Sequence, residues 1–312
     1  MGGNLVQVGK EEIRVKGKPI EVASIQIDEK VILITGKAIK IAKLKEEWYE
    51  DVESPASIVK QLETRRAKAD IFTFWQRLPD TEPKFQYHME WESIAALPIK
   101  TYDYWLSKQV DSNTRRGIKK AEKKGVDVKV ANFDDEFVKG ITNIFGETPI
   151  RQGKPFWHYK KNFETVKLEM ADRLDKSDFI GAYYNGELIG FIKLLHAGRY
   201  ADMVEILSKV EHRDKSPNNV LIARAVELCI EKRIPYLVYS LWPRGSLGEF
   251  KRRNGFEKID LPRYYIPVTL KGKVALRLGL HHGIKDIIPD RWKDRLVDVR
   301  RKYYTNKFTE ST

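Results

Sequence analysis

The sequence predicts an α/β protein with mixed central sheets flanked by helices. From about residue 133 onward it alternates helical and strand-like segments, an order typical of a layered α/β domain. Asn185-Gly186 separates two apolar runs, 179–184 and 188–195, and this dipeptide is the strongest short signal for a β-hairpin. The helical pattern at 217–232 lies between two further apolar runs, which favours a right-handed crossover between parallel strands. Antiparallel and parallel pairing are therefore expected in one sheet.

Residues 1–105 are predicted to be rich in strands. Alternating apolar and polar residues indicate half-buried strands, and Val31–Thr35 is apolar enough for a strand buried on both faces. Ser57–Lys68 has the apolar spacing of a helix, with Ile58 and Leu62 inward. The strands expected in this region are 12–15, 20–27, 31–35, 71–75 and 87–99.

The next segments alternate between the two kinds of element. Helices are expected at 102–109, 112–124, 133–145, 157–174, 217–232 and 247–253. Strands are expected at 179–184, 188–195, 200–208, 236–241 and within 256–268.

The start of the helix at 217–232 is the first candidate site. Ser216 is a suitable N-cap and Pro217 a suitable first residue. The free backbone N–H groups and the positive end of the helix dipole would attract an anion, most usefully a phosphate. His212, Arg213 and Lys215 stand just before this point. The alternative is an ordinary core helix preceded by a solvated basic loop.

The C-terminal residues 271–312 are predicted to form a basic helical tail. They hold eleven lysines and arginines against five acidic residues, and their apolar side includes Trp292 and Tyr303. Such a helix can lie on an anionic membrane surface. Docking onto its own domain is the alternative.

Length and charge set wider bounds. A chain of 312 residues is long enough for about two domains. Its net charge of +13 favours anionic partners such as phosphates, RNA or an anionic membrane surface. The single cysteine, Cys229, excludes an internal disulfide, and we expect neither a signal peptide nor a membrane span. We therefore predict a cytoplasmic protein, with peripheral contact at the inner face of the membrane as an option.

Four stretches carry a resemblance to a known superfamily. They are Arg115–Val126, with its Arg-Arg-Gly-Ile-Lys-Lys-Ala run, the hairpin Ala182–Phe191, the loop and helix Ser216–Cys229, and Glu249–Phe256, which reads Glu-Phe-Lys-Arg-Arg-Asn-Gly-Phe. In this order they resemble the GNAT N-acyltransferases and, more closely, the FemA/FemB/FemX group. The resemblance covers about residues 100–260.

The resemblance implies two tandem GNAT-like halves, 1–105 and 106–270, followed by the tail at 271–312. It implies an N-acyltransferase that moves an acyl or aminoacyl group from a CoA-type thioester to an amine acceptor. The acceptor would be a small molecule or a cell-envelope precursor. Acyl-CoA would be a co-substrate, and no metal is expected.

One departure bears on the donor. The usual acetyl-CoA loop carries two glycines, and here Ser216 and Asn218 stand in that frame after Arg213. Glycine allows the backbone to approach a pyrophosphate closely. FemAB-like proteins also lack these glycines, and their peptidoglycan-building members use aminoacyl-tRNA. An aminoacyl-tRNA-dependent peptidoglycan bridge transferase is therefore an alternative, although no long charged helical insertion like that of the bridge-forming members is present.

Three residues are candidates for catalysis. The resemblance implies that Lys251 supports a developing oxyanion or a donor phosphate electrostatically. Tyr239 lies on a strand next to the donor site and could protonate the leaving group. Glu205 sits in an otherwise apolar strand, where burial would raise its pKa and make it a general base. The alternatives are a surface lysine, a half-buried strand tyrosine and a solvent-facing glutamate.

The same interpretation as an acyltransferase also suggests residues that bind the two substrates. Candidates for the donor are Arg213, Lys215, Ser216, Asn218 and Asn219, and candidates for the acceptor are Arg151, Lys154 and His158. Candidates for phosphates of tRNA or of a nucleotide-linked acceptor are Arg115, Arg116, Lys119, Lys120 and Lys123, on one helix. Solvated surface charge is the alternative for these basic residues.

Other chemistry has little support in the sequence. The six histidines show no metal-ligand spacing with Cys229 or a carboxylate, and Cys229 is predicted to be a core residue. A non-catalytic protein that binds RNA or a membrane surface on the same fold is the remaining alternative.

Overall fold

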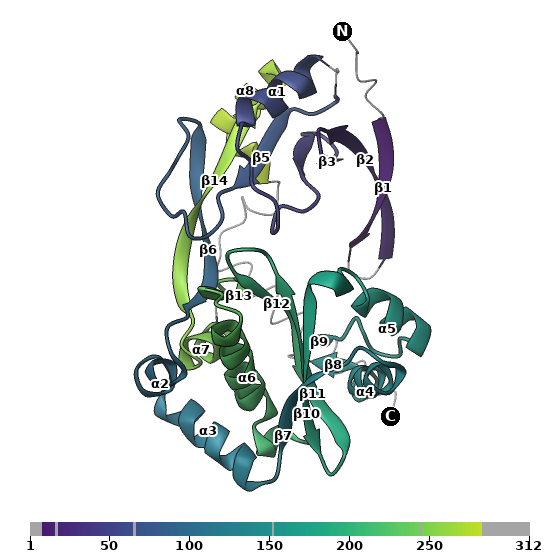
Figure 1. The fold of residues 1–312 in the computed structure, drawn as a ribbon. Coiled ribbons are helices and arrows are strands. Elements are labelled where there is room, and N and C mark those ends of the chain that lie inside the picture. Colours follow the sequence, from purple (N-terminus) through teal and green to yellow (C-terminus); the bar gives the residue numbers. More distant parts are fainter. Residues whose placement is uncertain (1–7, 16–17, 65–66, 152, 244, 283–312) are drawn as a thin grey trace. The chain divides into compact units, whose positions relative to one another are not determined.

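The computed structural model describes residues 8–282, apart from 16–17, 65–66, 152 and 244. Its chain divides into two compact units (Figure 1). Unit 1 comprises the described residues through Glu92, residues 153–155 and the described residues from Leu261 onward; unit 2 comprises residues 93–151 and 156–260. The predicted tail lies outside the described residues from position 283 on.

Unit 1 is built on strands, as predicted. Its elements are β1 (Val8–Val15), β2 (Lys18–Ile27), β3 (Lys30–Thr35), β4 (Ile41–Leu44), α1 (Pro55–Thr64), β5 (Ile71–Trp75), β9 (Lys154–Pro155), α8 (Leu270–Arg277) and the 3₁₀ turn η4 (Leu280–His282). Strands β6 (His88–Pro98) and β14 (Glu257–Pro267) each run from one unit into the other.

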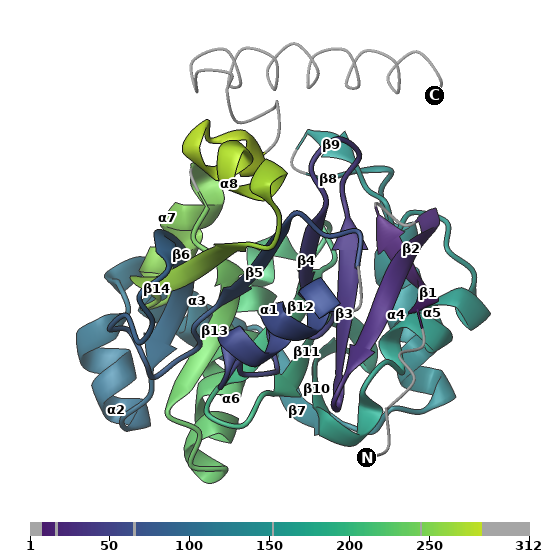
Figure 2. The same cartoon turned by 90° about the horizontal axis from the view of Figure 1, so that it is seen from above.

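The sheet of unit 1 is mixed. Its strands follow the order β1-β2-β3-β4-β5-β14, with β4 and β5 parallel and the other neighbours antiparallel. Helix α1 is drawn in front of the sheet in Figure 2, and its Ile58 and Leu62 pack into a core with Phe72 and Phe74 of β5 and Tyr264 of β14. The inward face predicted for this helix is confirmed.

Unit 2 is a three-layer α/β structure. Its remaining elements are α2 (Tyr102–Tyr104), the π-helix η1 (Trp105–Gln109), α3 (Ser112–Lys123), β7 (Asp127–Ala131), α4 (Asp135–Gly146), β8 (Ile150–Arg151), α5 (Phe163–Met170), η2 (Leu174–Lys176), β10 (Ser177–Tyr184), β11 (Glu187–His196), β12 (Ala201–Ser208), η3 (Arg213–Lys215), α6 (Pro217–Glu231), β13 (Tyr236–Leu241) and α7 (Ser246–Arg253).

The sheet of unit 2 has the order β6-β13-β12-β11-β10-β7. Among the described strands of this sheet, only β12 and β13 are parallel neighbours, and they are joined through α6, so the predicted connection between parallel strands is confirmed. Helices α3 and α6 pack in one core and α4 and α5 in another, on opposite faces of the sheet (Figure 1). Cys229 of α6 is fully buried, as predicted, and burial raises the pKa of its thiol to about 12, which leaves it unreactive.

Two local predictions are wrong. The helix predicted at 157–174 is only α5, because Lys160 adopts a positive φ of 61° and Asn162 caps a new helix through the backbone N–H of Thr165. Ser216 does not cap α6 with its side chain; it has a left-handed backbone with φ of 55°. Pro217 is the first residue of α6, as predicted.

Candidate functional site

The candidate site lies where two parallel strands of unit 2 stop pairing. The pairing of β12 with β13 is confined to Ala201–Leu237 and Asp202–Val238. Immediately afterwards each strand is irregular: β12 is bulged at Val204, and β13 shifts its register against β6 after Val238. A bulge re-aims the side chains that follow it, and bulges are frequent next to active sites. Glu205 and Tyr239 are the residues that these two irregularities place.

Glu205 has the properties of a base that works near neutral pH. The bulge puts Val204 at the exposed position and Glu205 at a half-buried one, with 24% of its side chain accessible. Burial raises the pKa of the Glu205 carboxyl to about 7, although the positive charges of Lys161 and Arg151 act to lower it. A carboxyl group with such a pKa can accept a proton from an ammonium and release it to solvent.

His158 lies beside Glu205, with its Nε2 3.8 Å from a carboxylate oxygen of that residue. Its side chain is buried and packs against the ring of Phe145. Burial and the nearby charge of Lys161 lower its pKa to about 3, so the imidazole is neutral. Lys161 donates to Nδ1, at 3.3 Å, which puts the ring proton on Nε2 and towards Glu205. Sequence reasoning proposed His158 for the acceptor; the structure places it next to the candidate base.

Tyr239 and Lys251 form the other side of the site. Burial and the charge of Glu205 raise the pKa of the Tyr239 hydroxyl, so this group stays protonated at neutral pH. Lys251 on α7 is fully buried, and its Nζ donates to the carbonyl oxygens of Tyr239 and, at 2.9 Å, of Leu241. The ammonium also lies 4.1 Å from the centre of the Tyr239 ring. Burial lowers the pKa of Lys251 to about 8.

The two carbonyls that bind Lys251 flank Ser240. This residue has a φ of 55°, a left-handed conformation that costs a non-glycine residue free energy. Lys251 therefore holds the irregular end of β13 in the shape that carries Tyr239.

Arg151 and Glu147 form a second, internal support. Arg151 donates to the carbonyl oxygens of Ser208 at 2.8 Å and Ile144 at 3.2 Å, and to the Glu147 carboxylate at 3.0 Å. The same carboxylate accepts the backbone N–H groups of Val210 and Glu211 at 2.7 and 2.9 Å. This pair fixes the chain between β12 and the predicted donor loop. Glu147 was missed by sequence reasoning, because its partners are brought to it by the tertiary fold and not by spacing along a helix.

We expect Glu147→Ala to free this loop. The substitution leaves two backbone donors unpaired and a largely buried guanidinium without its counter-charge, and it should lower the free energy of unfolding by about 3 kcal/mol. Hydrogen exchange should accelerate at the Val210 and Glu211 amides. Glu211→Ala is the matched control, because it removes an exposed carboxylate from the same loop and leaves both amides bonded. Equal exchange in the two variants would contradict the assignment.

The predicted donor residues gather at the start of α6. Arg213 is exposed. Burial and the positive charge of Arg213 both lower the pKa of Arg151, so the two guanidinium groups lie near each other. Lys215 lies 4.6 Å from the centre of the Tyr184 ring. Asn218 has a buried Oδ1 with no hydrogen-bond partner among the described residues. Asn219 donates to Oδ1 of Asn254 at 3.3 Å.

The basic helix α3 adjoins this start. A Cβ on Gly117 would lie 3.0 Å from Oδ1 of Asn219, so α3 and α6 approach each other closely at this position. Lys124, just after α3, contacts Asp214 of η3 at 2.5 Å. Arg115 turns inward and donates to the Leu106 and Val110 carbonyls. The exposed basic residues of α3 are Arg116, Lys119, Lys120 and Lys123.

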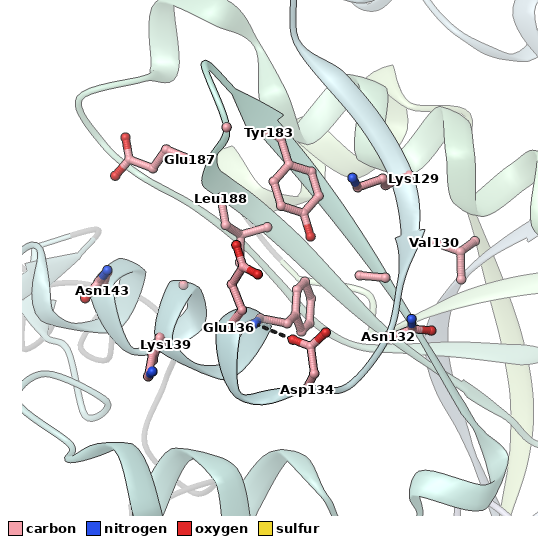
Figure 3. A pocket seen from close by; sticks show the side chains of 14 residues that line it. Lys129, Val130, Asn132, Asp134, Glu136, Lys139, Asn143, Tyr183, Glu187 and Leu188 are labelled. Atoms are coloured by element: carbon pink, nitrogen blue, oxygen red, sulfur yellow. Dashed lines mark hydrogen bonds between the residues drawn. The ribbon is translucent and has the colours of Figure 1, made fainter.

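Lys154, the remaining acceptor candidate, is exposed on β9 of unit 1. A separate pocket of about 530 Å³ in unit 2 is lined by β7, the start of α4 and the β10–β11 hairpin. Figure 3 shows Tyr183, Lys129 and Glu136 around it. None of the candidate residues derived from the sequence lines this pocket. None of the described helices is both long and apolar enough to cross a lipid bilayer.

Solved structures share this fold. FemX covers 87% of this chain and 90% of its own, with a TM-score of 0.55 and 10% identity. The C-terminal domain of a putative lysylphosphatidylglycerol synthetase from Agrobacterium fabrum covers 83% and 88%, with a TM-score of 0.52 and 12% identity. L-PGS from Bacillus licheniformis covers 76% and 80%, with a TM-score of 0.51 and 14% identity. No family model and no curated protein matches the sequence. The chain therefore has the fold of FemX and of these synthetase domains, in agreement with the resemblance to the FemA/FemB/FemX group.

Proposed function

We propose that the protein transfers an acyl or aminoacyl group from an activated ester to an amine. The observation that carries this proposal is the position of Glu205, with a pKa raised to about 7, at the point where β12 and β13 part, opposite the protonated Tyr239. A base near neutrality and a protonated acid on neighbouring strands are the two groups that amide formation from an ammonium needs.

The proposed reaction removes two protons from the acceptor ammonium and forms one amide bond. Glu205 takes one proton from the acceptor ammonium and later releases it to solvent. The free amine attacks the donor carbonyl carbon, and a C–N bond forms as the C–S or C–O bond to the leaving group breaks. Tyr239 gives its proton to the leaving group and regains the second amine proton. Positioning of donor and acceptor supplies most of the acceleration.

A CoA-type thioester is the first candidate donor. The start of α6, a 15-residue helix, presents backbone N–H groups close to Arg213 and Lys215, which suits a diphosphate. Ser216 already has the left-handed backbone that glycine adopts most easily, so the absence of the two glycines does not exclude a close approach.

An aminoacyl-tRNA donor is favoured by a different observation. The exposed basic residues of α3 lie on the helix that packs against the start of α6, so phosphate-binding groups extend well beyond a single diphosphate site. The likeness to FemX and to proteins named for lysylphosphatidylglycerol supports an aminoacyl group, with a cell-envelope precursor or a lipid as acceptor. Work at the inner face of an anionic membrane would fit such an acceptor.

Calorimetric titration with CoA, acetyl-CoA and tRNA tests the donor. We expect Arg213→Glu and Lys215→Glu to weaken binding of the true donor at least about tenfold, because each reverses a charge beside the helix start. Arg277→Glu, an exposed arginine of unit 1, is the matched control. If tRNA is the donor, Lys120→Glu and Lys123→Glu should also weaken its binding and reduce the salt dependence, without affecting CoA.

The outcomes separate the candidates. Saturable CoA binding sensitive to Arg213 assigns the thioester donor, and tRNA binding sensitive to both sets of residues assigns the aminoacyl donor. RNA or anionic vesicles bound without any group transfer, and without an effect of Glu205→Gln, would instead support the non-catalytic binding protein.

A further inference from the structure

Unit 1 brings His88 together with His281 and His282, which are far from it in the sequence. His88 and Glu90 lie two residues apart on β6, which puts their side chains on the same face of the strand. His281 and His282 form the end of η4. The Nε2 atoms of the three imidazoles lie 3.3 Å (His88), 2.8 Å (His281) and 3.1 Å (His282) from the same carboxylate oxygen of Glu90.

The spacing of these atoms matches the coordination sphere of a metal ion. Metal–ligand bonds of 2.0–2.1 Å in a tetrahedral zinc site place neighbouring ligand atoms about 3.3 Å apart. The ligand atoms of His88, Glu90 and His281 all lie within 4.8 Å of one another, and small rotations of the side chains would close this set around an ion. The Nε2 atom of His282 lies 2.8 Å from the second carboxylate oxygen of Glu90, so this imidazole adjoins the set through Glu90.

In the part of the chain that the structure describes, no basic side chain fills the cluster. Among the residues that the structure describes, no lysine or arginine donates to Glu90. The other group of similar composition, Glu187, Glu211 and His212 in unit 2, is different. There Lys209 donates to both carboxylates and supplies the positive charge that an ion would bring. Among the described residues, three imidazoles converge on one carboxylate without an ammonium or guanidinium group, and this donor set suits a transition metal.

The accessibility of the four side chains also suits metal entry. His281 is buried, with 2% of its side chain exposed, and its ring packs against Tyr265 with centroids 4.6 Å apart. The side chains of His88, Glu90 and His282 are 48%, 33% and 37% exposed. The cluster therefore has one fixed ligand and an open side through which an ion can enter.

We propose that His88, Glu90, His281 and His282 bind one divalent first-row transition metal ion, Zn²⁺ in preference to the others. Four protein ligands would close a tetrahedral site, which is the pattern of a structural ion. The ion would join the start of β6 to η4, two segments of unit 1 separated by more than half of the described chain. This site is independent of the transferase proposal, which concerns unit 2.

The test uses the full-length chain without a polyhistidine tag, after treatment with a chelator. Titration with Co²⁺ should give one equivalent bound, with the intense visible absorption of a tetrahedral site, and Zn²⁺ should displace it. His88→Ala and His282→Ala remove exposed ligands and should leave the fold intact. Each should weaken Co²⁺ binding by more than the roughly 10- to 100-fold that the loss of an outer-shell partner costs.

His212→Ala is the matched control, since it removes one histidine from the cluster that Lys209 already fills. It should leave Co²⁺ binding unchanged. Glu90→Gln provides a further variant of nearly equal size, and it should lower affinity and abolish the tetrahedral spectrum. An octahedral spectrum in the wild-type protein, no stoichiometric binding, or equal losses in His212→Ala and His88→Ala would each overturn the proposal.

Discussion

Glu205→Gln should make the protein more stable at pH 8 and should strongly reduce the proposed transferase activity. The folded state holds the pKa of Glu205 at about 7, whereas the unfolded chain has the ordinary value of 4.5. Between these values the folded state binds more protons, so the stability of the wild-type protein falls as the pH rises through this window. Glutamine has no charge to bury. The stability gained by the variant should therefore be about 2 kcal/mol larger at pH 8 than at pH 5.

The measurement is denaturant unfolding of both proteins at several pH values between 4 and 9. Glu187→Gln is a control of opposite sign, because the hydrogen bond from Lys209 lowers the pKa of Glu187. A lowered carboxyl pKa contributes stability above the unfolded value, so Glu187→Gln should lose stability relative to wild type as the pH rises through the acidic range. Parallel pH profiles of wild type and Glu205→Gln would show that Glu205 is an ordinary exposed carboxylate.

The same variant tests the chemistry once the donor is known. The wild-type rate should rise as the pH passes through about 7, because the deprotonated carboxylate is the active form. Glu205→Gln should lose this dependence together with about 10²- to 10⁴-fold in rate, the usual contribution of a general base. A variant that is more stable but inactive is the expected signature of a functional residue held in an unfavourable environment.

These properties could be predicted from the sequence only in part. The Asn185-Gly186 hairpin and the helix that begins at Pro217 follow from local signals, and both are confirmed. The position of Glu205 does not follow from local signals, because strict alternation along β12 would have placed it on the same face as the buried Ala201 and Met203. It depends on the bulge at Val204, which arises from pairing with β11 rather than from a turn signal in β12.

Contacts between residues that are far apart in the sequence could not be predicted either. His88 and His281 are separated by more than half of the chain, so no sequence spacing could join them to Glu90. Lys251 was identified only through a motif, and its burial against the Tyr239 and Leu241 carbonyls could not be anticipated from a short basic helix. Residues that act through tertiary contacts leave no periodic signal, and this explains why Glu147 was missed as well.

Lys251→Met should destabilise unit 2 by about 2–4 kcal/mol, because methionine fills similar space but leaves two carbonyl oxygens without their donor. Ser240, between these carbonyls, should then leave its left-handed conformation, and the amides of 239–241 should exchange faster. Arg252→Met is the matched control; it removes an exposed cation from the next position of α7 and should change stability by less than about 0.5 kcal/mol.

A second substitution distinguishes support of β13 from direct action on the substrate. Glycine adopts a φ of 55° without the penalty that serine incurs, so Ser240→Gly should restore part of the stability, and part of the activity, of Lys251→Met. Such rescue would show that Lys251 acts through the shape of the strand that carries Tyr239. If Lys251 instead stabilises an oxyanion or a donor phosphate, Lys251→Met should lose activity whatever residue stands at position 240. The double-mutant cycle therefore decides between two roles that a single substitution at Lys251 cannot separate, since both predict an inactive protein.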